Sequence, residues 1–236
     1  MIPLKDDVPS QSLPLATVGL ILINVLVFLY QVSLGIGTGG TGGGAGEAFV
    51  MEFGLVPCRL TGGCPGLDDF PSPTATIFTS MFLHGDLFHI GGNMLYLWIF
   101  GDNVEDTLGH GRFLLFYLAS GVVAGLAQTF SSPASRLPQI GASGAISGVL
   151  GAYLILFPYA RVLTLLIVGF FVRFIYIPAM IVLGFWIVVQ LVNGYLTSGA
   201  LGRGETGGVA WFAHIGGFLA GMLLLFLFRP RRSVRL

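Results

Sequence analysis

The stretch IGASGAISGVLGAY, residues 140–153, places two serines four positions apart in a run of otherwise small or apolar residues. Such a run favours a helix that packs closely against a neighbour, because small side chains let two backbones approach each other. Ser143 and Ser147 could both be packing residues, each hydroxyl bonded to the carbonyl one turn earlier. The alternative is that one of them is a nucleophile, and the rest of the sequence has to distinguish these interpretations.

The composition indicates a membrane protein. Of 236 residues, 54% are hydrophobic and 9% are charged, and a water-soluble domain could not expose so much apolar surface without aggregating. Long apolar runs predict six membrane-spanning helices. The runs are 13–34, 87–100, 113–130, 140–157, 177–192 and 209–228. We therefore expect an all-α membrane protein with a six-transmembrane-helix bundle.

Two apolar stretches need separate interpretation. Residues 162–174 contain Arg173 and run into Pro178, so we expect an interfacial segment that leads into the fifth helix, and no seventh span. The run 13–34 carries Asn24 and is not followed by a small-x-small cleavage pattern. We expect it to be a retained helix and not a signal peptide.

The basic residues predict the orientation. Six spans place both termini on one side, together with eight of the eleven Lys and Arg residues, and the positive-inside rule then assigns that side to the cytoplasm. We expect a multi-pass protein of the cell membrane, of prokaryotic type. Its parts are a cytoplasmic segment 1–12, a membrane domain 13–228 with an external loop 35–80, and a basic cytoplasmic tail 229–236. The zero net charge does not suggest nucleic acid as a partner.

The external loop contains two features of its own. Cys58 and Cys64 flank RLTGG, and an oxidising compartment would permit a small disulfide ring, with two free thiols as the alternative. A zinc site is not favoured, because no second pair of ligands lies at metal-binding spacing. The glycine-rich stretch 35–47 predicts a flexible tether.

Polar residues recur near one end of three predicted helices. Polar groups within spans are costly and usually face a protein interior or a water-filled cavity. With a cytoplasmic amino terminus, the second, fourth and sixth helices all begin at the external face. His89, Asn93, Ser143 and His214 should therefore lie at a similar depth near that face.

The fourth and sixth helices each carry a small-xxx-small face. These faces are Gly144 with Gly148 and Gly217 with Gly221, and they let two backbones come into contact. Ser143 lies one residue before the first face. The contact would bring it near His214, within the hydrogen-bond reach that a base-activated nucleophile needs. A packing serine and a histidine bonded to a backbone carbonyl remain the alternative.

His89 and Asn93 lie four residues apart, on one face of the second helix. Both side chains can donate hydrogen bonds to an oxyanion, beside the free N–H groups at the start of the fourth helix. Interhelical hydrogen bonding without a catalytic part is the alternative. Asp86, with His84, is expected to order the entrance of this helix. The sequence GASGA lacks the second glycine of the G-x-S-x-G elbow, which argues against a soluble hydrolase.

The chain resembles the rhomboid intramembrane serine proteases in three motifs. They are H-x-x-x-x-H-x-x-x-N at His84, His89 and Asn93, G-x-S-G at Gly141, Ser143 and Gly144, and A-H-x-x-G-x-x-x-G at Ala213, His214, Gly217 and Gly221. The resemblance implies a catalytic dyad with Ser143 as nucleophile and His214 as base. It implies that His89, Asn93 and the Ser143 N–H hold the oxyanion, and that Glu105 has a structural role.

Two positions depart from the family pattern. A Trp-Arg pair that many rhomboids carry in the first loop is replaced by Ala75 and Thr76, so the anchoring of this loop is open. Ser147 occupies a position where many members place an aromatic residue that packs on the base. What restrains His214 is therefore also open.

We expect an intramembrane serine endopeptidase that cleaves transmembrane segments of single-span membrane proteins in the lipid bilayer, without a metal or organic cofactor. The main alternative is a catalytically inactive rhomboid-like protein that binds membrane clients, which would be expected to lose the nucleophile or the base. A small channel or transporter would need a polar lining deeper in the membrane than these helix ends.

Overall fold

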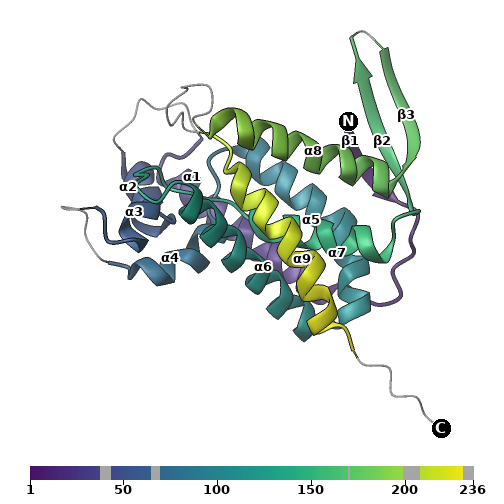
Figure 1. Cartoon of the computed structure of the whole chain (residues 1–236), viewed down its shortest axis with the longest axis horizontal. Coiled ribbons are helices and arrows are strands. Elements are labelled where there is room, and N and C mark those ends of the chain that lie inside the picture. Colours follow the sequence, from purple (N-terminus) through teal and green to yellow (C-terminus); the bar gives the residue numbers. More distant parts are fainter. Residues whose placement is uncertain (38–43, 65–69, 170, 199–207, 231–236) are drawn as a thin grey trace.

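Figure 1 shows a computed structural model, which describes the chain except for residues 38–43, 65–69, 170, 199–207 and 231–236. Parts of the predicted tether and most of the predicted basic tail lie outside the described residues. Long helices form the body of the molecule. They are α1 (Leu15–Ser33), α5 (Leu87–Leu108), α6 (His110–Ser131), α7 (Ser143–Leu156), α8 (Ala179–Thr197) and α9 (Trp211–Phe228). Each predicted apolar run coincides with one of these helices, in the predicted order.

The helices differ in length and apolar character. By length and composition α1, α6, α8 and α9 could each cross a membrane, and α7 is a shorter apolar helix. Helix α5 carries Asp102, Glu105 and Asp106 in its last two turns. The described chain is therefore mostly helical, with several apolar helices long enough to span a bilayer.

Helix α7 lies at the centre of the molecule, and the outer helices present apolar side chains outward. Every residue from Gly144 to Tyr153 is buried, because α5, α6 and α9 all pack against this helix (Figure 1). Helix α8 instead exposes Ile181, Phe185 and Val188. An apolar outer surface of this kind suits contact with lipid.

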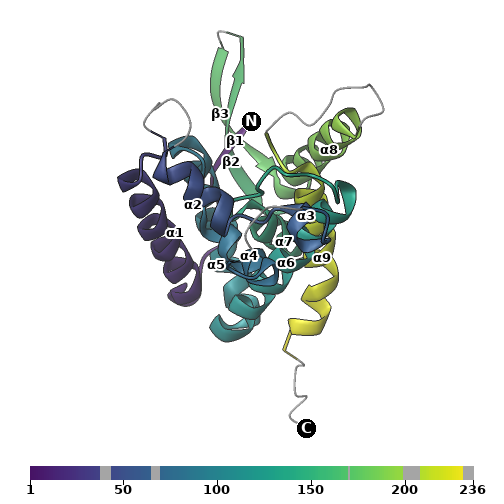
Figure 2. The same ribbon diagram turned by 90° about the vertical axis from the view of Figure 1, so that its left-hand side faces the viewer.

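In the part of the connection between α1 and α5 that the structure describes, there are four short helices. They are α2 (Ala45–Phe53), α3 (Pro57–Leu60), α4 (Pro73–Thr79) and the 3-10 helix η1 (Ser80–Phe82). Figure 2, which looks onto one end of the molecule, shows α2, α3 and α4 gathered over that end. Much of the predicted external loop 35–80 is therefore helical.

A three-stranded antiparallel sheet corrects the all-α prediction. It contains β1 (Ile2–Asp6), β2 (Arg161–Val168) and β3 (Phe171–Pro178), in the order β1-β2-β3. The segment predicted as interfacial is thus a hairpin, which turns at Gly169 with a φ of 57°. A continuous apolar run does not distinguish strand from helix by its periodicity, and here the β-branched and aromatic residues favour strands.

The amino-terminal strand is tied to the helices as well as to β2. Tyr153 Oη donates to Asp6 Oδ2 at 2.5 Å, and Arg161 N donates to Asp7 Oδ1 at 2.7 Å. Burial raises the pKa of Asp6 to about 6, although the Tyr153 hydrogen bond acts in the opposite direction. These bonds fix β1 against α7 and β2.

Glu105 holds the start of α1. Its carboxylate oxygens accept from Ala16 N and Thr17 N, each at 2.8 Å, and so satisfy two N–H groups that lack partners in the first turn of a helix. The exposed ring of His110, which follows α5, lies 2.5 Å from the same carboxylate. These contacts tie the start of α1 to the last turn of α5 and stabilise the packing of the two helices.

Candidate active site

The described chain brings Ser143 and His214 together. Ser143 is the first residue of α7, and His214 lies one turn into α9. The His214 Nε2 atom is 2.8 Å from Ser143 Oγ, so a hydrogen bond joins the hydroxyl to the imidazole.

Glycines set the distance between these two helices. A Cβ built at Gly217 would overlap the carbonyl of Gly144, and one at Gly221 would overlap the backbone of Gly148. Helices α7 and α9 are therefore in direct backbone contact, as the small-xxx-small faces predict. The close crossing carries the serine and the histidine into hydrogen-bond range.

Ser147 makes the bond expected of a packing serine. Its hydroxyl donates to the Ser143 carbonyl at 2.6 Å, and the residue is buried. The packing interpretation therefore describes Ser147, whereas the Ser143 hydroxyl bonds to an imidazole.

Helix α8 supplies the second contact of His214. Gln190 Oε1 is 2.8 Å from His214 Nδ1, and Gln190 Nε2 donates to the Trp186 carbonyl at 3.1 Å. The ring centroids of Trp186 and His214 are 5.8 Å apart, with the planes tilted by 37°. Gln190 and Trp186 therefore contact the imidazole of His214, whose restraint the sequence had left open. Neither residue was assigned a role from the sequence.

The orientation of Gln190 determines the tautomer of His214. Its amide nitrogen is already a donor to Trp186, so its oxygen faces the imidazole and must accept a hydrogen bond. His214 Nδ1 therefore carries the proton, and Nε2 of the neutral ring is left to accept from the Ser143 hydroxyl. This is the arrangement that a general base needs.

Gln128 of α6 satisfies the first turn of α9. Its Oε1 accepts from Phe212 N at 3.0 Å and from Ala213 N at 3.3 Å. Free N–H groups at a helix start need such acceptors when they lie inside a protein. The contact fixes the backbone immediately before His214, and sequence reasoning did not single out Gln128.

His89 and Asn93 converge on the residue two positions before Ser143. Gly141 has a φ of 121°, which a side chain would disfavour. A Cβ built there would lie 2.7 Å from His89 Nε2 and 3.6 Å from Asn93 Nδ2. Gly141 is therefore required both for its backbone conformation and for the space between these two donors.

Both donors are oriented toward this space. Gly85 N donates to His89 Nδ1 at 3.4 Å, which leaves the proton of a neutral imidazole on Nε2. Asn93 Nδ2 is buried without a hydrogen-bond partner among the residues that the structure describes. An unpaired buried N–H group costs free energy, and an oxyanion at this position would satisfy it.

The start of α5 is fixed by its own residues and by α1. Asp86 accepts from His89 N at 2.8 Å and caps the helix. Gln31 of α1 bonds to both the N–H and the carbonyl of His84. Burial lowers the pKa of His84 to about 3, with a further contribution from His89. His84 is therefore neutral at physiological pH, and its ring packs against His89 with the centroids 5.0 Å apart.

A cavity of about 1340 Å³ joins these groups. Its lining includes His89, Asn93, Ser143, Trp186 and His214. All four predicted site residues therefore face one space, together with one aromatic residue of α8. A volume of this size exceeds what a drug-sized ligand fills and can admit a segment of polypeptide chain.

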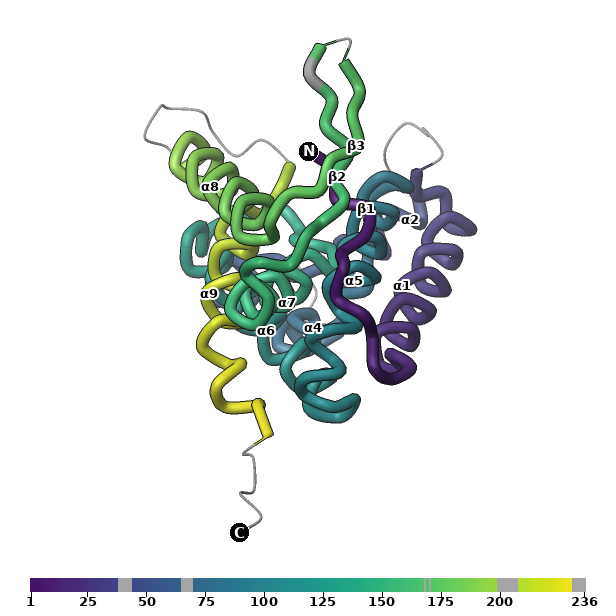
Figure 3. Tube along the Cα trace, turned by 90° about the vertical axis from the view of Figure 1, so that its right-hand side faces the viewer, coloured from purple at the N-terminus to yellow at the C-terminus, as the bar shows by residue number. Residues whose placement is uncertain are grey.

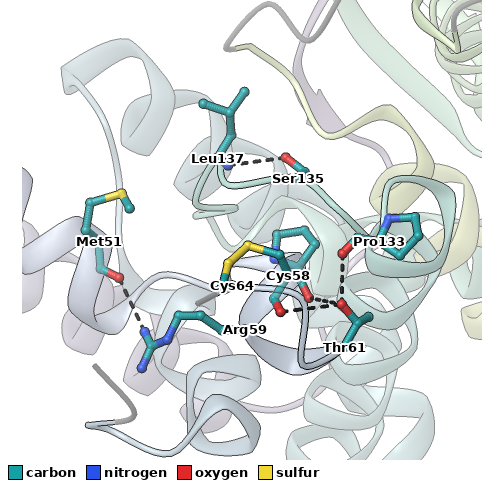
Figure 4. Close-up of a disulfide and its surroundings, with 9 residues drawn as sticks. Met51, Cys58, Arg59, Thr61, Cys64, Pro133, Ser135 and Leu137 are labelled. Carbon is teal, nitrogen blue, oxygen red and sulfur yellow. Dashed lines mark hydrogen bonds between the residues drawn. A yellow bond between two sulfur atoms is a disulfide. The ribbon is translucent and has the colours of Figure 1, made fainter. Parts of the chain in front are cut away.

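The connection between α1 and α5 is anchored to the segment that leads into Ser143. Leu55 and Gln139 exchange backbone hydrogen bonds at 3.0 and 2.8 Å, and Cys58 N donates to Ser135 O at 3.0 Å. Thr61 Oγ1 donates to Pro133 O at 2.9 Å (Figure 4). Backbone pairing with residues 133–139 thus anchors the loop that lacks the Trp-Arg pair.

The loop is also closed on itself. Cys58 and Cys64 form a disulfide with their Cα atoms 5.1 Å apart, which resolves the alternative left open by the sequence (Figure 4). Arg59 donates to the carbonyls of Glu52 at 3.2 Å and Pro71 at 2.9 Å. These contacts hold α2, α3 and the start of α4 together.

The fold and this site define a mostly helical membrane protein with a hydrogen-bonded serine and histidine at the meeting point of its helices. The sequence profile of the rhomboid domain matches residues 72–231, which include every residue of the candidate site. The chain belongs to the rhomboid family. It is therefore a multi-pass membrane protein.

Several curated relatives are similar to this chain. Rhomboid protein 1, mitochondrial, of Saccharomyces cerevisiae is 31% identical over 160 residues, which cover 66% of this chain and 42% of the relative. Rhomboid protease GluP of Bacillus subtilis is 38% identical over 148 residues, 63% of this chain and 25% of the relative. RHOMBOID-like protein 1 of Arabidopsis thaliana is 33% identical over 157 residues, 66% of this chain and 35% of the relative. The matched regions thus cover less than half of each relative's length.

Proposed function

We propose that this protein is an intramembrane serine endopeptidase that cleaves transmembrane segments of other membrane proteins. The observation that carries the proposal is the 2.8 Å contact between Ser143 Oγ and His214 Nε2 in a chain of the rhomboid family. The name of one relative, a rhomboid protease, agrees with this activity.

In the proposed mechanism Ser143 Oγ attacks the carbonyl carbon of the scissile peptide bond while its proton passes to His214 Nε2. The carbon–nitrogen bond then breaks, and the same proton passes to the leaving amine. A water molecule, deprotonated by His214, hydrolyses the acyl-enzyme and regenerates the Ser143 hydroxyl. Gln190 keeps the imidazole in the required tautomer during both steps.

The carbonyl oxygen gains negative charge during the attack. We assign its stabilisation to His89 Nε2, Asn93 Nδ2 and the backbone N–H of Ser143, which is free because Ser143 begins α7. This assignment gives the unpartnered Asn93 amide an acceptor. It also accounts for the glycine at position 141, since a side chain there would fill the space beside both donors.

We propose that the substrates are single-span proteins with a locally weak helix near the external face. A peptide bond within a regular helix has its carbonyl hydrogen-bonded, so the chain must unwind before Ser143 can reach it. Glycine and other weak helix formers in the substrate lower the cost of unwinding.

We further propose that α1 and α5 to α9 all cross the bilayer of a cell membrane, with both termini in the cytoplasm. The pairing of β1 with β2 supports this topology, because it requires the amino terminus and the α7–α8 connection to lie on one side. The positive-inside rule favours the cytoplasm for that side.

A client-binding protein without catalytic activity remains the alternative function. Such a protein has no need of a serine hydroxyl bonded to a correctly oriented imidazole. The Ser143–His214–Gln190 hydrogen bonds therefore favour the protease.

The test is labelling of the purified protein with a fluorophosphonate probe, combined with cleavage of a single-span model substrate in vesicles. We expect Ser143→Ala to abolish both labelling and cleavage, because Ser143 is the one hydroxyl that bonds to His214 among the described residues. Ser147→Ala, the matched control, should retain most of both. A dead Ser147→Ala variant would overturn the assignment, and a preference for soluble unfolded protein would exclude intramembrane cleavage.

Asn93→Ala tests the oxyanion site in the same assay. We expect kcat to fall about a hundredfold, as loss of one oxyanion donor typically costs on the order of 3 kcal/mol, with little change in KM. A raised KM at unchanged kcat would assign Asn93 to substrate docking.

A further inference from the structure

The hairpin of β2 and β3 exposes large apolar side chains. Ile167, Val172, Phe174 and Tyr176 are 55%, 58%, 64% and 61% exposed. Figures 1 and 3 show the hairpin projecting beyond the helices at the end of the molecule that carries β1. Apolar residues gathered in this way indicate a contact surface, since soluble surfaces rarely present them together.

The strand register places these side chains on one face. Leu163 pairs with Tyr176, Leu165 with Phe174 and Ile167 with Val172. Directly opposed residues of an antiparallel pair share a face, and neighbours in sequence alternate between faces. The hairpin face is therefore Leu163, Leu165, Ile167, Val172, Phe174 and Tyr176.

Arg161, at the base of the hairpin, pairs with Pro178 and lies on the same side of the sheet as the hairpin face, whereas the opposite face carries Arg173 and the exposed Phe171. Arg173 pairs with Leu166 on that face, and it is the one charged residue between positions 162 and 178. A long Arg side chain can reach water or headgroups while the rest of its strand contacts apolar material.

The hairpin face continues into a surface that contacts lipid. Helix α8 begins at Ala179, directly after β3 ends at Pro178. Its Ile181, Phe185 and Val188 are exposed, and α8 is long and apolar enough to span the membrane. The apolar face of the hairpin therefore adjoins the lipid-facing side of α8 at the junction between β3 and α8.

The free edge of β3 limits how deep the hairpin can lie. In the order β1-β2-β3 no other strand of the described residues pairs with the outer edge of β3, so its outward N–H and C=O groups need water or headgroups. The hydrocarbon core offers them no partners, and open sheet edges do not occur there. The boundary between headgroups and acyl chains satisfies both the apolar face and the free edge.

We propose that the hairpin face lies in the interfacial layer of the bilayer, with Phe174 and Tyr176 toward the acyl chains and Arg173 toward the headgroups. Aromatic and basic residues are typical of that layer. The partner is thus the lipid surface on the β1 side of the membrane. The proposal needs a membrane-embedded α8 and is independent of proteolytic activity.

The test uses single introduced cysteines. The chain has two native cysteines, and they are joined in a disulfide, so an introduced thiol can be labelled alone with the fluorophore NBD. The variants Val172→Cys, Arg173→Cys and Phe174→Cys are reconstituted in vesicles of phosphatidylcholine with a minority of phosphatidylglycerol. Val188→Cys on α8 is the lipid-facing control, and Ala134→Cys, in the exposed α6–α7 connection, is the aqueous control.

We expect an alternating pattern. Doxyl-labelled lipids should remove most of the NBD emission at Val172 and Phe174, as at Val188, and iodide should quench NBD at Arg173, as at Ala134. Iodide quenching at Phe174 as strong as at Ala134 would overturn the proposal. Protection at Phe174 that is insensitive to doxyl lipids and disappears on dilution of the protein would also overturn it, because it would assign the face to a second copy.

The full-length protein with Phe174→Ser provides a check that does not depend on labelling. Tyr176 and Ile167 remain, so the variant keeps most of the hairpin face. Tryptic cleavage after Arg173 in intact protein should be slow in vesicles and faster in the variant. Equal cleavage rates for both proteins, with and without vesicles, would contradict lipid contact.

Discussion

Helix α9 meets α7 and α8 at the site in different ways. Against α7 the contact is between backbones, through Gly217 and Gly221. Against α8 it is between side chains, through His214 with Gln190 and Trp186. The first contact involves no side-chain rotamers, and it fixes how far Ser143 lies from His214. The second depends on rotamers and fixes how the imidazole is oriented.

The backbone contact should be the more sensitive of the two. We expect Gly221→Ala to destabilise the protein by about 3 kcal/mol, since overpacking by a methyl group costs that much when the neighbours cannot move, and to abolish cleavage. Thermal unfolding in detergent and the cleavage assay check this.

Gly184→Ala is the matched control for Gly221→Ala. A Cβ built at Gly184 of α8 meets no atom of the described residues within 4 Å. We expect a change in stability of less than about 1 kcal/mol, the range of helix propensity. Equal destabilisation by both substitutions would show that α7 and α9 are no tighter than the rest of the bundle.

The side-chain contact should affect rate more than stability. We expect Gln190→Ala to lower kcat on the order of tenfold to a hundredfold, because a general base that is less well positioned loses part of its contribution to the rate. The free energy of unfolding should change little. Gln190→Glu retains an acceptor for Nδ1 and should recover much of the rate. It should also move the acid limb of the pH–rate profile to higher pH, because a carboxylate favours the imidazolium.

Asn193→Ala is the control for the Gln190 variants. Asn193 lies on the same helix and bonds to the Val189 carbonyl, whereas the hydrogen bonds of His214 among the described residues go to Gln190 and Ser143. A rate unaffected by Gln190→Ala, or an equal loss in Asn193→Ala, would show that Gln190 does not orient the base.

The smallest effect is expected at Asp86, the carboxylate nearest to His89 in sequence. Asp86 caps α5, and among the described residues His214 bonds to Gln190 and Ser143 instead. Asn is as good a helix cap as Asp, so Asp86→Asn should change kcat by less than about threefold. A loss of about a thousandfold would mean that a carboxylate assists His214.

The backbone contact between α7 and α9 could be predicted from the sequence, but the side-chain contact between α8 and α9 could not. Glycine spacing predicts a close crossing directly, because only small residues permit it. Gln190 was not predicted as a partner of His214, because both the lipid-facing and the packed sides of α8 are apolar. Hydropathy therefore gives no direction for the polar residue between them.

The sheet was missed for a related reason. Apart from Arg161, Thr164 and Arg173, residues 161–178 are mostly apolar on both faces, so strand alternation is absent from the pattern. The pairing of β1 with β2 joins segments far apart in the chain, which local propensity does not encode. The anchoring of the α1–α5 connection on residues 133–139 rests on backbone hydrogen bonds, which no side-chain motif reports.

The attachment of the amino terminus has a consequence for the order of assembly. Residues 2–6 pair with 162–165, and Asp6 bonds to Tyr153. Strand β2 follows α7 in the chain, so during synthesis β1 can pair with it only after α7 is complete. Until then the partners available to this end of the chain lie on α5, among them Asp102, Asp106 and Glu105. Closure of the sheet therefore requires that α1, α5, α6 and α7 have all been synthesised.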